Sequence, residues 1–122
     1  MKGVGLILIV AVLFLSAAAA GLHVHVIISG SMAPAIKTGA LTITADTSFD
    51  TVKKGDVIVY TRADDRLSVT HRVIRKYRDH LITRGDANEA EDAPVKASEI
   101  DEKVLFHVPL AGYLLTLALI KK

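Results

Sequence analysis

Residues 22–34 read LHVHVIISGSMAP, and this stretch joins an apolar segment to the remainder of the chain. Its first seven residues are rich in β-branched side chains and partly alternate with histidines, a pattern typical of a strand. Serine and glycine follow, and both favour turns. The stretch therefore predicts a strand that leads to a turn carrying Ser31, a short distance beyond the apolar segment.

The chain before this strand is almost entirely apolar. Residues 4–20 contain one polar side chain, Ser16, and no charge. A helix needs about 20 apolar residues to cross a bilayer core, so residues 4–22 are just sufficient for a membrane span. Lys2 favours a cytoplasmic N-terminal end and an exported domain. The residues leave open whether this segment is retained as an anchor or cleaved as a secretory signal after the alanines at 17–20.

A second apolar segment follows the central part of the chain. Residues 106–120 are apolar except for His107 and Thr116, and two lysines come after them. This length is short for a membrane helix. The segment either crosses a thin bilayer as a second membrane helix, which we favour, or lies along the membrane or the domain.

Short strands are predicted between the two apolar segments, each bounded by turn residues. This pattern predicts a mostly β fold, namely a small curled antiparallel β-sheet domain with an N-terminal transmembrane helix and a short C-terminal hydrophobic segment. The polar residues 85–99 are predicted to form a loop with one helical turn near Ser98. The predicted strands cover residues 41–44, 57–60, 67–74, 80–83 and 103–108. The predicted parts are 1–28, the membrane anchor and exit strand; 29–105, the extracytoplasmic β domain; and 106–122, the hydrophobic segment.

Composition restricts the kinds of site that the chain can form. There is no cysteine, which excludes disulfides and thiolate metal sites. Lys+Arg (15) and Asp+Glu (13) nearly balance, and the basic residues are not interleaved with aromatic ones, so no nucleic-acid surface is predicted. The His-x-His spacing of His23 and His25 suits metal chelation, but no third or fourth ligand is evident. The sequence therefore predicts no metal and no cofactor.

Ser31 has candidate partners for nucleophilic chemistry elsewhere in the chain. A serine hydroxyl is a weak nucleophile until a base takes its proton, and His71 lies on a predicted strand. Asp86 and Asp92 follow in the polar loop, and either could fix the imidazole tautomer, which is the third part of an acyl-transfer site. Each residue also has a common structural explanation: a turn serine, a half-buried strand histidine and solvated aspartates.

Four short blocks of sequence together carry a family resemblance. They occur in the order Ser-Gly-Ser-Met-x-Pro at 29–34, Gly-Asp-Val-Ile-Val-Tyr at 55–60, Thr-His-Arg-Val-Ile at 70–74 and Arg-Gly-Asp-x-Asn at 84–88. In this order and at these separations they resemble type I signal peptidases. His71 stands where the usual bacterial enzymes have a lysine, so the resemblance is to the histidine branch found in archaea, the endoplasmic reticulum and some sporulating bacteria.

The resemblance implies an activity and assigns roles to residues. Ser31 would be the nucleophile and His71 the general base, with Asp86 and Asp92 both implicated and their division of roles open. Ser29 and the Ser31 backbone N–H would form the oxyanion hole. The implied enzyme removes signal peptides from exported preproteins after small residues at positions −1 and −3. Its catalytic domain would lie on the extracytoplasmic side of the cytoplasmic membrane, with the lipid bilayer and the protein export machinery as partners.

Two positions depart from the family pattern, and other functions stay open. Ala33 stands where glutamate is most common, and Ala87 where asparagine is frequent, so the loop that carries Asp86 lacks one side-chain amide. A membrane protease for a special set of precursors fits the same residues. So do a non-catalytic β domain that binds a partner and an inactive peptidase-like subunit.

Overall fold

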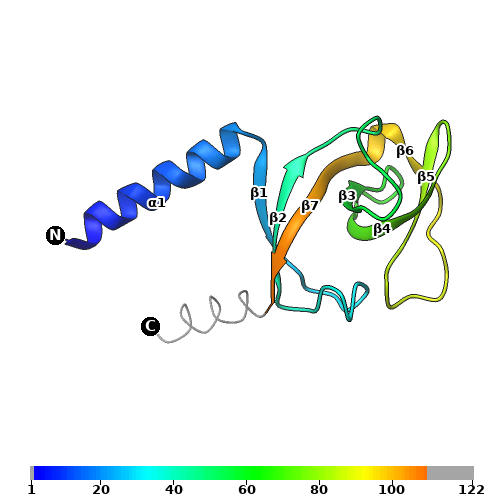
Figure 1. Cartoon of the computed structure of the whole chain (residues 1–122), viewed down its shortest axis with the longest axis horizontal. Helices are drawn as coiled ribbons and strands as arrows, with labels where there is room; N and C mark the ends of the chain where they lie inside the picture. The colour runs from blue at the N-terminus through cyan, green and yellow to red at the C-terminus, as the bar shows by residue number, and fades with distance from the viewer. Residues whose placement is uncertain (1, 110–122) are drawn as a thin grey trace.

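The computed structural model describes residues 2–109, which form one α-helix, one short 3-10 helix and a seven-stranded sheet (Figure 1). The mostly β fold with a curled antiparallel sheet, as predicted, is confirmed. The helices are α1 (Lys2–Ala19) and the short 3-10 helix η1 (Ala97–Glu99). The strands are β1 (Leu22–Val26), β2 (Leu41–Asp46), β3 (Val57–Thr61), β4 (Ser68–Lys76), β5 (His80–Arg84), β6 (Val95–Lys96) and β7 (Ile100–Val108).

The order of strands in the sheet is β1-β2-β7-β3-β4-β5-β6, and every neighbouring pair is antiparallel. Strand β7 lies between β2 and β3, so it joins the pair β1 and β2 to the strands β3 to β6 (Figure 1). The short strand β6 falls inside the predicted loop 85–99. Sequence pattern did not predict it, because two residues are too few to show an alternation.

Two apolar clusters hold the strands and the turn at Ser31 in place. In the first cluster, Ile58 and Leu81 are fully buried, and burial of each such side chain contributes about 1.5–3 kcal/mol. In the second cluster, Met32 packs with Ile36 and Ala40, so the residue that follows Ser31 is fixed in the interior. The first cluster consists of Val52, Ile58, Tyr60, Val73, Leu81, Val95 and Ile100.

Helix α1 projects from the sheet beside β1 (Figure 1). Its large apolar side chains are exposed. The helix ends at Ala19, before the end of the predicted membrane span, because the chain turns at Gly21 with φ of 78°. Within residues 2–109, no helix combines the length and the apolar character needed to cross a membrane. The structure therefore does not support the predicted transmembrane helix.

The C-terminal hydrophobic segment is described only at its start. Strand β7 continues through Val108, so Phe106 to Val108 are part of the sheet and pair with β2. The remainder of the predicted segment, from residue 110 onward, lies outside the described residues.

Candidate active site

His71 lies on β4, on the face of the sheet that carries the first cluster. Antiparallel pairing places Ile58 opposite His71 and Thr83 opposite Val73. Because alternate residues of a strand share a face, His71 lies on the same side of the sheet as Tyr60 and Thr83. Its side chain is only 10% exposed, so it forms hydrogen bonds mainly with other residues and not with solvent.

Asp92 is the carboxylate that contacts His71. The distance from His71 Nδ1 to Asp92 Oδ2 is 2.6 Å, and the Asp92 side chain is 22% exposed. An ionised carboxylate only accepts hydrogen bonds, so this contact is a hydrogen bond to Asp92 when Nδ1 carries the ring proton. In the neutral ring, Nε2 is then the unprotonated nitrogen that can act as a base.

Two hydroxyl groups hold Asp92 in this position. Thr83 Oγ1 lies 2.7 Å and the Tyr60 hydroxyl 3.2 Å from the same Oδ2 atom, and the Asp92 backbone N–H donates to the Thr83 carbonyl at 2.9 Å. Burial raises the pKa of Tyr60 to about 12, with the Asp92 charge as a smaller cause, so the phenol stays protonated and can donate. The orientation of Asp92 is therefore fixed from three sides.

Ser31 lies in the turn after β1, close to the free nitrogen of His71. A Cβ atom placed on Gly85 would lie 2.6 Å from the Ser31 carbonyl oxygen and 2.9 Å from His71 Nε2. A side chain at position 85 would therefore collide with both Ser31 and His71, so only glycine fits at this position. Ser31 Oγ is 3.1 Å from Ser29 Oγ. No hydrogen bond links Ser31 Oγ to His71 among the described residues.

Asp86, the other candidate carboxylate, contacts Arg72 and not His71. Arg72 Nε and Nη2 donate to its two carboxylate oxygens at 3.0 and 2.9 Å, and Arg72 Nη1 donates to the Gly55 carbonyl. The hydrogen bonds to Asp86 raise the pKa of Arg72. Neighbouring residues of a strand point to opposite faces. Arg72 and its partner Asp86 therefore lie on the face of the sheet opposite to the imidazole of His71.

The loop after β5 is attached to the Ser31 turn by its backbone. The Ala87 N–H donates to the Ser31 carbonyl at 2.8 Å, and the Asn88 N–H donates to the Gly85 carbonyl at 2.9 Å. With the Arg72–Asp86 pair, these bonds hold the loop without the side-chain amide that Ala87 lacks. Ala33, the other departure, precedes Pro34 in the Ser31 turn.

A cleft of about 510 Å³ runs past these residues. Ser29, Ser31, His71 and Asn88 supply polar groups, and the walls come from β1, the chain after it, and β3 and β4. Most of the wall is apolar, which is typical of a site that binds an organic ligand or a peptide. The apolar wall residues include Val26, Ile27, Ile28, Met32, Val59, Leu67 and Val69.

Three residues around the site were not identified from the sequence. Tyr60, Thr83 and Gly85 all fall within or beside the blocks of the resemblance, yet none has a chemical signature of its own. Their role in placing Asp92 and Ser31 follows from cross-strand register and from close packing, which one sequence does not reveal. His23 and His25 contact other carboxylates, at 2.8 Å to Asp46 and 2.7 Å to Glu102, and His25 also lines the cleft.

Comparison with known proteins identifies relatives of the chain. No protein-family model matches it. It is 32% identical to the signal peptidase complex catalytic subunit SEC11 of Ogataea parapolymorpha over 72% of this chain and 62% of that protein. The proteins of the same name from Tuber melanosporum and Zygosaccharomyces rouxii are 29% and 31% identical, again over 72% of this chain and 59% and 60% of theirs.

The chain spans about three fifths of the length of these relatives. Their names agree with the family resemblance at the level of the broad family, since all are catalytic subunits of a signal peptidase complex. The chain is thus similar to signal peptidase catalytic subunits over most of its own length.

Proposed function

We propose that the chain is a serine endopeptidase that removes signal peptides from exported preproteins, with Ser31 as nucleophile and His71 as general base. The main observation in support of this proposal is the position of the His71 imidazole. The hydrogen bond between His71 Nδ1 and Asp92 leaves Nε2 beside the turn that holds Ser31. The similarity to signal peptidase catalytic subunits agrees with this assignment.

The proposed reaction follows from these positions. Ser31 Oγ attacks the carbonyl carbon of the scissile bond while His71 Nε2 takes its proton, and Asp92 stabilises the resulting imidazolium. His71 then gives that proton to the leaving amine, and the signal peptide stays as an ester on Ser31. A water molecule, deprotonated by His71, hydrolyses the ester and restores the serine.

The oxyanion of each tetrahedral intermediate would be bound by the Ser31 backbone N–H and the Ser29 hydroxyl. Within residues 2–109, the Ser31 N–H has no hydrogen-bond acceptor, and the one hydrogen bond of Ser29 Oγ is to Ser31 Oγ. Donors aimed at developing charge contribute about 3 kcal/mol each. Rotation of the Ser31 hydroxyl from Ser29 toward His71 would free the Ser29 hydroxyl for this role, and such catalytic hydrogen bonds commonly tighten only when substrate is bound.

The cleft suits an extended peptide with small side chains near the cut. Strand β1 is at the edge of the sheet, and the chain that follows it lines the cleft. A peptide added along such an edge gains main-chain hydrogen bonds, and shallow pockets select alternate side chains. We therefore propose a preference for small residues at −1 and −3.

Association with a lipid bilayer is proposed from the surface of α1. The side chains of Leu6 and Leu13 are each 64% exposed, and Leu15 is 71% exposed. An exposed apolar surface of this kind marks a membrane or protein interaction site. We propose that α1 holds the domain at the extracytoplasmic face of the cytoplasmic membrane, where other subunits or the export machinery could bind. Confining enzyme and substrate to one surface raises their effective concentration.

The proposal is tested with the full chain in lipid vesicles and a purified preprotein that has alanine at −1 and −3. The matched control substrate has leucine at −1, and vesicles without the chain give the background. We expect cleavage after the −1 alanine, located by the mass of the mature product, and a reaction with leucine that is slower by about tenfold or more. Absence of cleavage with bound preprotein would favour a binding module or an inactive subunit and would refute the peptidase.

A further inference from the structure

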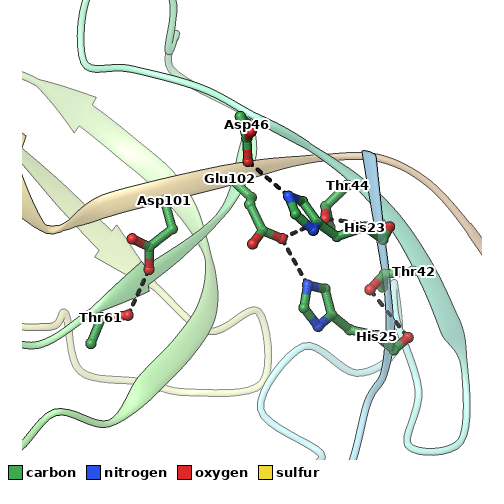
Figure 2. Close-up of polar contacts among 8 residues, drawn as sticks. All are labelled: His23, His25, Thr42, Thr44, Asp46, Thr61, Asp101 and Glu102. Carbon is green, nitrogen blue, oxygen red and sulfur yellow. Dashed lines mark hydrogen bonds and ion pairs between the residues drawn. The ribbon is translucent and has the colours of Figure 1, made fainter. Parts of the chain in front are cut away.

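Four side chains with metal-ligating atoms gather on one face of the sheet (Figure 2), and one of them, His25, also lines the cleft at Ser31. His23 and His25 come from β1, Asp46 from the end of β2, and Glu102 from β7. Figure 2 shows the Glu102 carboxylate between the two imidazole rings, with Asp46 beside His23. The cluster therefore combines residues from three neighbouring strands.

Strand register explains why these side chains meet. His23 is opposite Thr44, His25 is opposite Thr42, and Asp46 is opposite Glu102. Thr42, Thr44 and Asp46 alternate along β2 and so share one face. All four ligating side chains therefore project from the same side of the sheet.

The donor atoms are close enough together to hold one ion. Ligand atoms of His23, Asp46 and Glu102 all lie within 4.8 Å of one another. His23 Nε2 is 2.8 Å from Asp46 Oδ1. Ligand atoms about 2.0–2.2 Å from a zinc ion lie roughly 3–4 Å apart in tetrahedral geometry, so small side-chain rotations suffice to admit the ion.

Glu102 is held in place by partners that leave one oxygen available. Its Oε1 atom accepts hydrogen bonds from the Thr44 hydroxyl and from His25, the latter at 2.7 Å. Among the described residues, no hydrogen bond reaches Oε2. The Glu102 side chain is 15% exposed and Thr44 is fully buried, so the carboxylate has a fixed orientation. Such outer partners are typical of metal-binding carboxylates.

We propose that His23 Nε2, Asp46 and Glu102 bind a divalent transition-metal ion of the zinc class, with His25 fixing Glu102 from its other side. One imidazole and two carboxylates are a mixed nitrogen and oxygen set that suits zinc better than magnesium or calcium, which prefer all-oxygen sites. Three protein ligands leave a fourth position for water. Binding replaces the hydrogen bond between His23 and Asp46 and releases its shared proton.

The site lies at the joint between α1 and the sheet. The Asp46 backbone N–H donates to the Gly21 carbonyl at 2.8 Å, and a Cβ atom on Gly21 would lie 2.9 Å from Asp46 Oδ2. An ion at this place would link the start of β1 to β2 and β7. It would therefore stabilise the orientation of α1 relative to the domain that carries Ser31.

The test measures zinc binding by the untagged full chain in detergent, using competition with a chromogenic zinc chelator. We expect one saturable site per chain, and a rise in Tm of roughly 5–10 °C when free zinc is about ten times the dissociation constant. His23→Gln and Glu102→Gln should each weaken binding at least about 100-fold, and His25→Gln about tenfold. The matched control is His80→Gln, which removes an imidazole paired with a single carboxylate, Asp79, and should bind zinc like the parent chain.

Each result bears on the site alone, since none is read from cleavage. Saturable binding that His23→Gln and Glu102→Gln abolish, with magnesium unable to compete, supports the site. Absence of saturable zinc binding would overturn the proposal, as would binding that both variants retain or that magnesium matches. Circular dichroism of both variants, with the expected β spectrum, ensures that a loss of zinc is not a loss of fold.

Discussion

Replacement of Asp92 by asparagine separates the two candidate carboxylates. The change keeps the size of the side chain but removes the charge next to His71 Nδ1, at 2.6 Å. A charge-assisted hydrogen bond of this kind contributes about 1.5–3 kcal/mol, and the amide can also select the wrong imidazole tautomer. We therefore expect kcat/KM for preprotein cleavage to fall about 10²–10⁴-fold, or roughly 2.7–5.5 kcal/mol.

The matched variant is Asp86→Asn, which weakens the pair with Arg72 on the other side of β4. That pair is partly exposed, at 35% for Arg72 and 20% for Asp86, so its loss should cost about 1 kcal/mol of stability and change kcat/KM less than about fivefold. Initial rates with one preprotein, at enzyme concentrations verified by circular dichroism, give both values. A rate of Asp92→Asn within about tenfold of wild type would contradict the role of Asp92 as the partner of His71, as would an equal loss of activity in Asp86→Asn and Asp92→Asn.

Two further predictions concern the groups around Asp92 and Ser31. Gly85→Ala should reduce cleavage by at least about 100-fold, because its Cβ atom would lie 2.6 Å from the Ser31 carbonyl oxygen and displace the turn. The matched control is Gly30→Ala, where a Cβ atom meets nothing within 4 Å. Equal cleavage rates for the two variants would contradict the close approach of Gly85 to Ser31. Tyr60 has a pKa of about 12 in the folded protein and an ordinary value of 10.0. Above pH 10 the unfolded chain loses this proton first, so the free energy of unfolding should fall by roughly 2 kcal/mol as the pH rises from about 10 to about 12. Tyr60→Phe should remove that part of the decline in urea titrations, and an unchanged decline would show that the phenol is not the titrating group.

The sequence pattern predicted where most of the strands lie. It did not predict which side chains from different strands come together on one face of the sheet. Residues 57–60 and 80–83 alternate or are β-branched, and they became β3 and β5 because local preference and burial agree there. The choice between Asp86 and Asp92 stayed open because it depends on register and on which side of β4 each loop residue lies. Sequence separation alone carries no such information.

The end of α1 and the cluster at His23 show two other limits of one sequence. The apolar run continues past Ala19, but the turn at Gly21 ends the helix there, so hydropathy overestimated its length. Asp46 and Glu102 lie far from His23 in the sequence and reach it only because β2 pairs with both β1 and β7. Ligands supplied by different strands become visible only once the order of the strands is known.

The most direct test is the rate of preprotein cleavage by Ser31→Ala and His71→Ala in lipid vesicles, compared with wild type. The controls are Ser98→Ala and His80→Ala, which change an exposed serine and a partly exposed histidine outside the cleft. We expect both active-site variants to lose at least about 10³-fold in kcat while their β spectra are unchanged, and both controls to cleave like wild type. Cleavage by Ser31→Ala at the wild-type rate would contradict a serine nucleophile at this position.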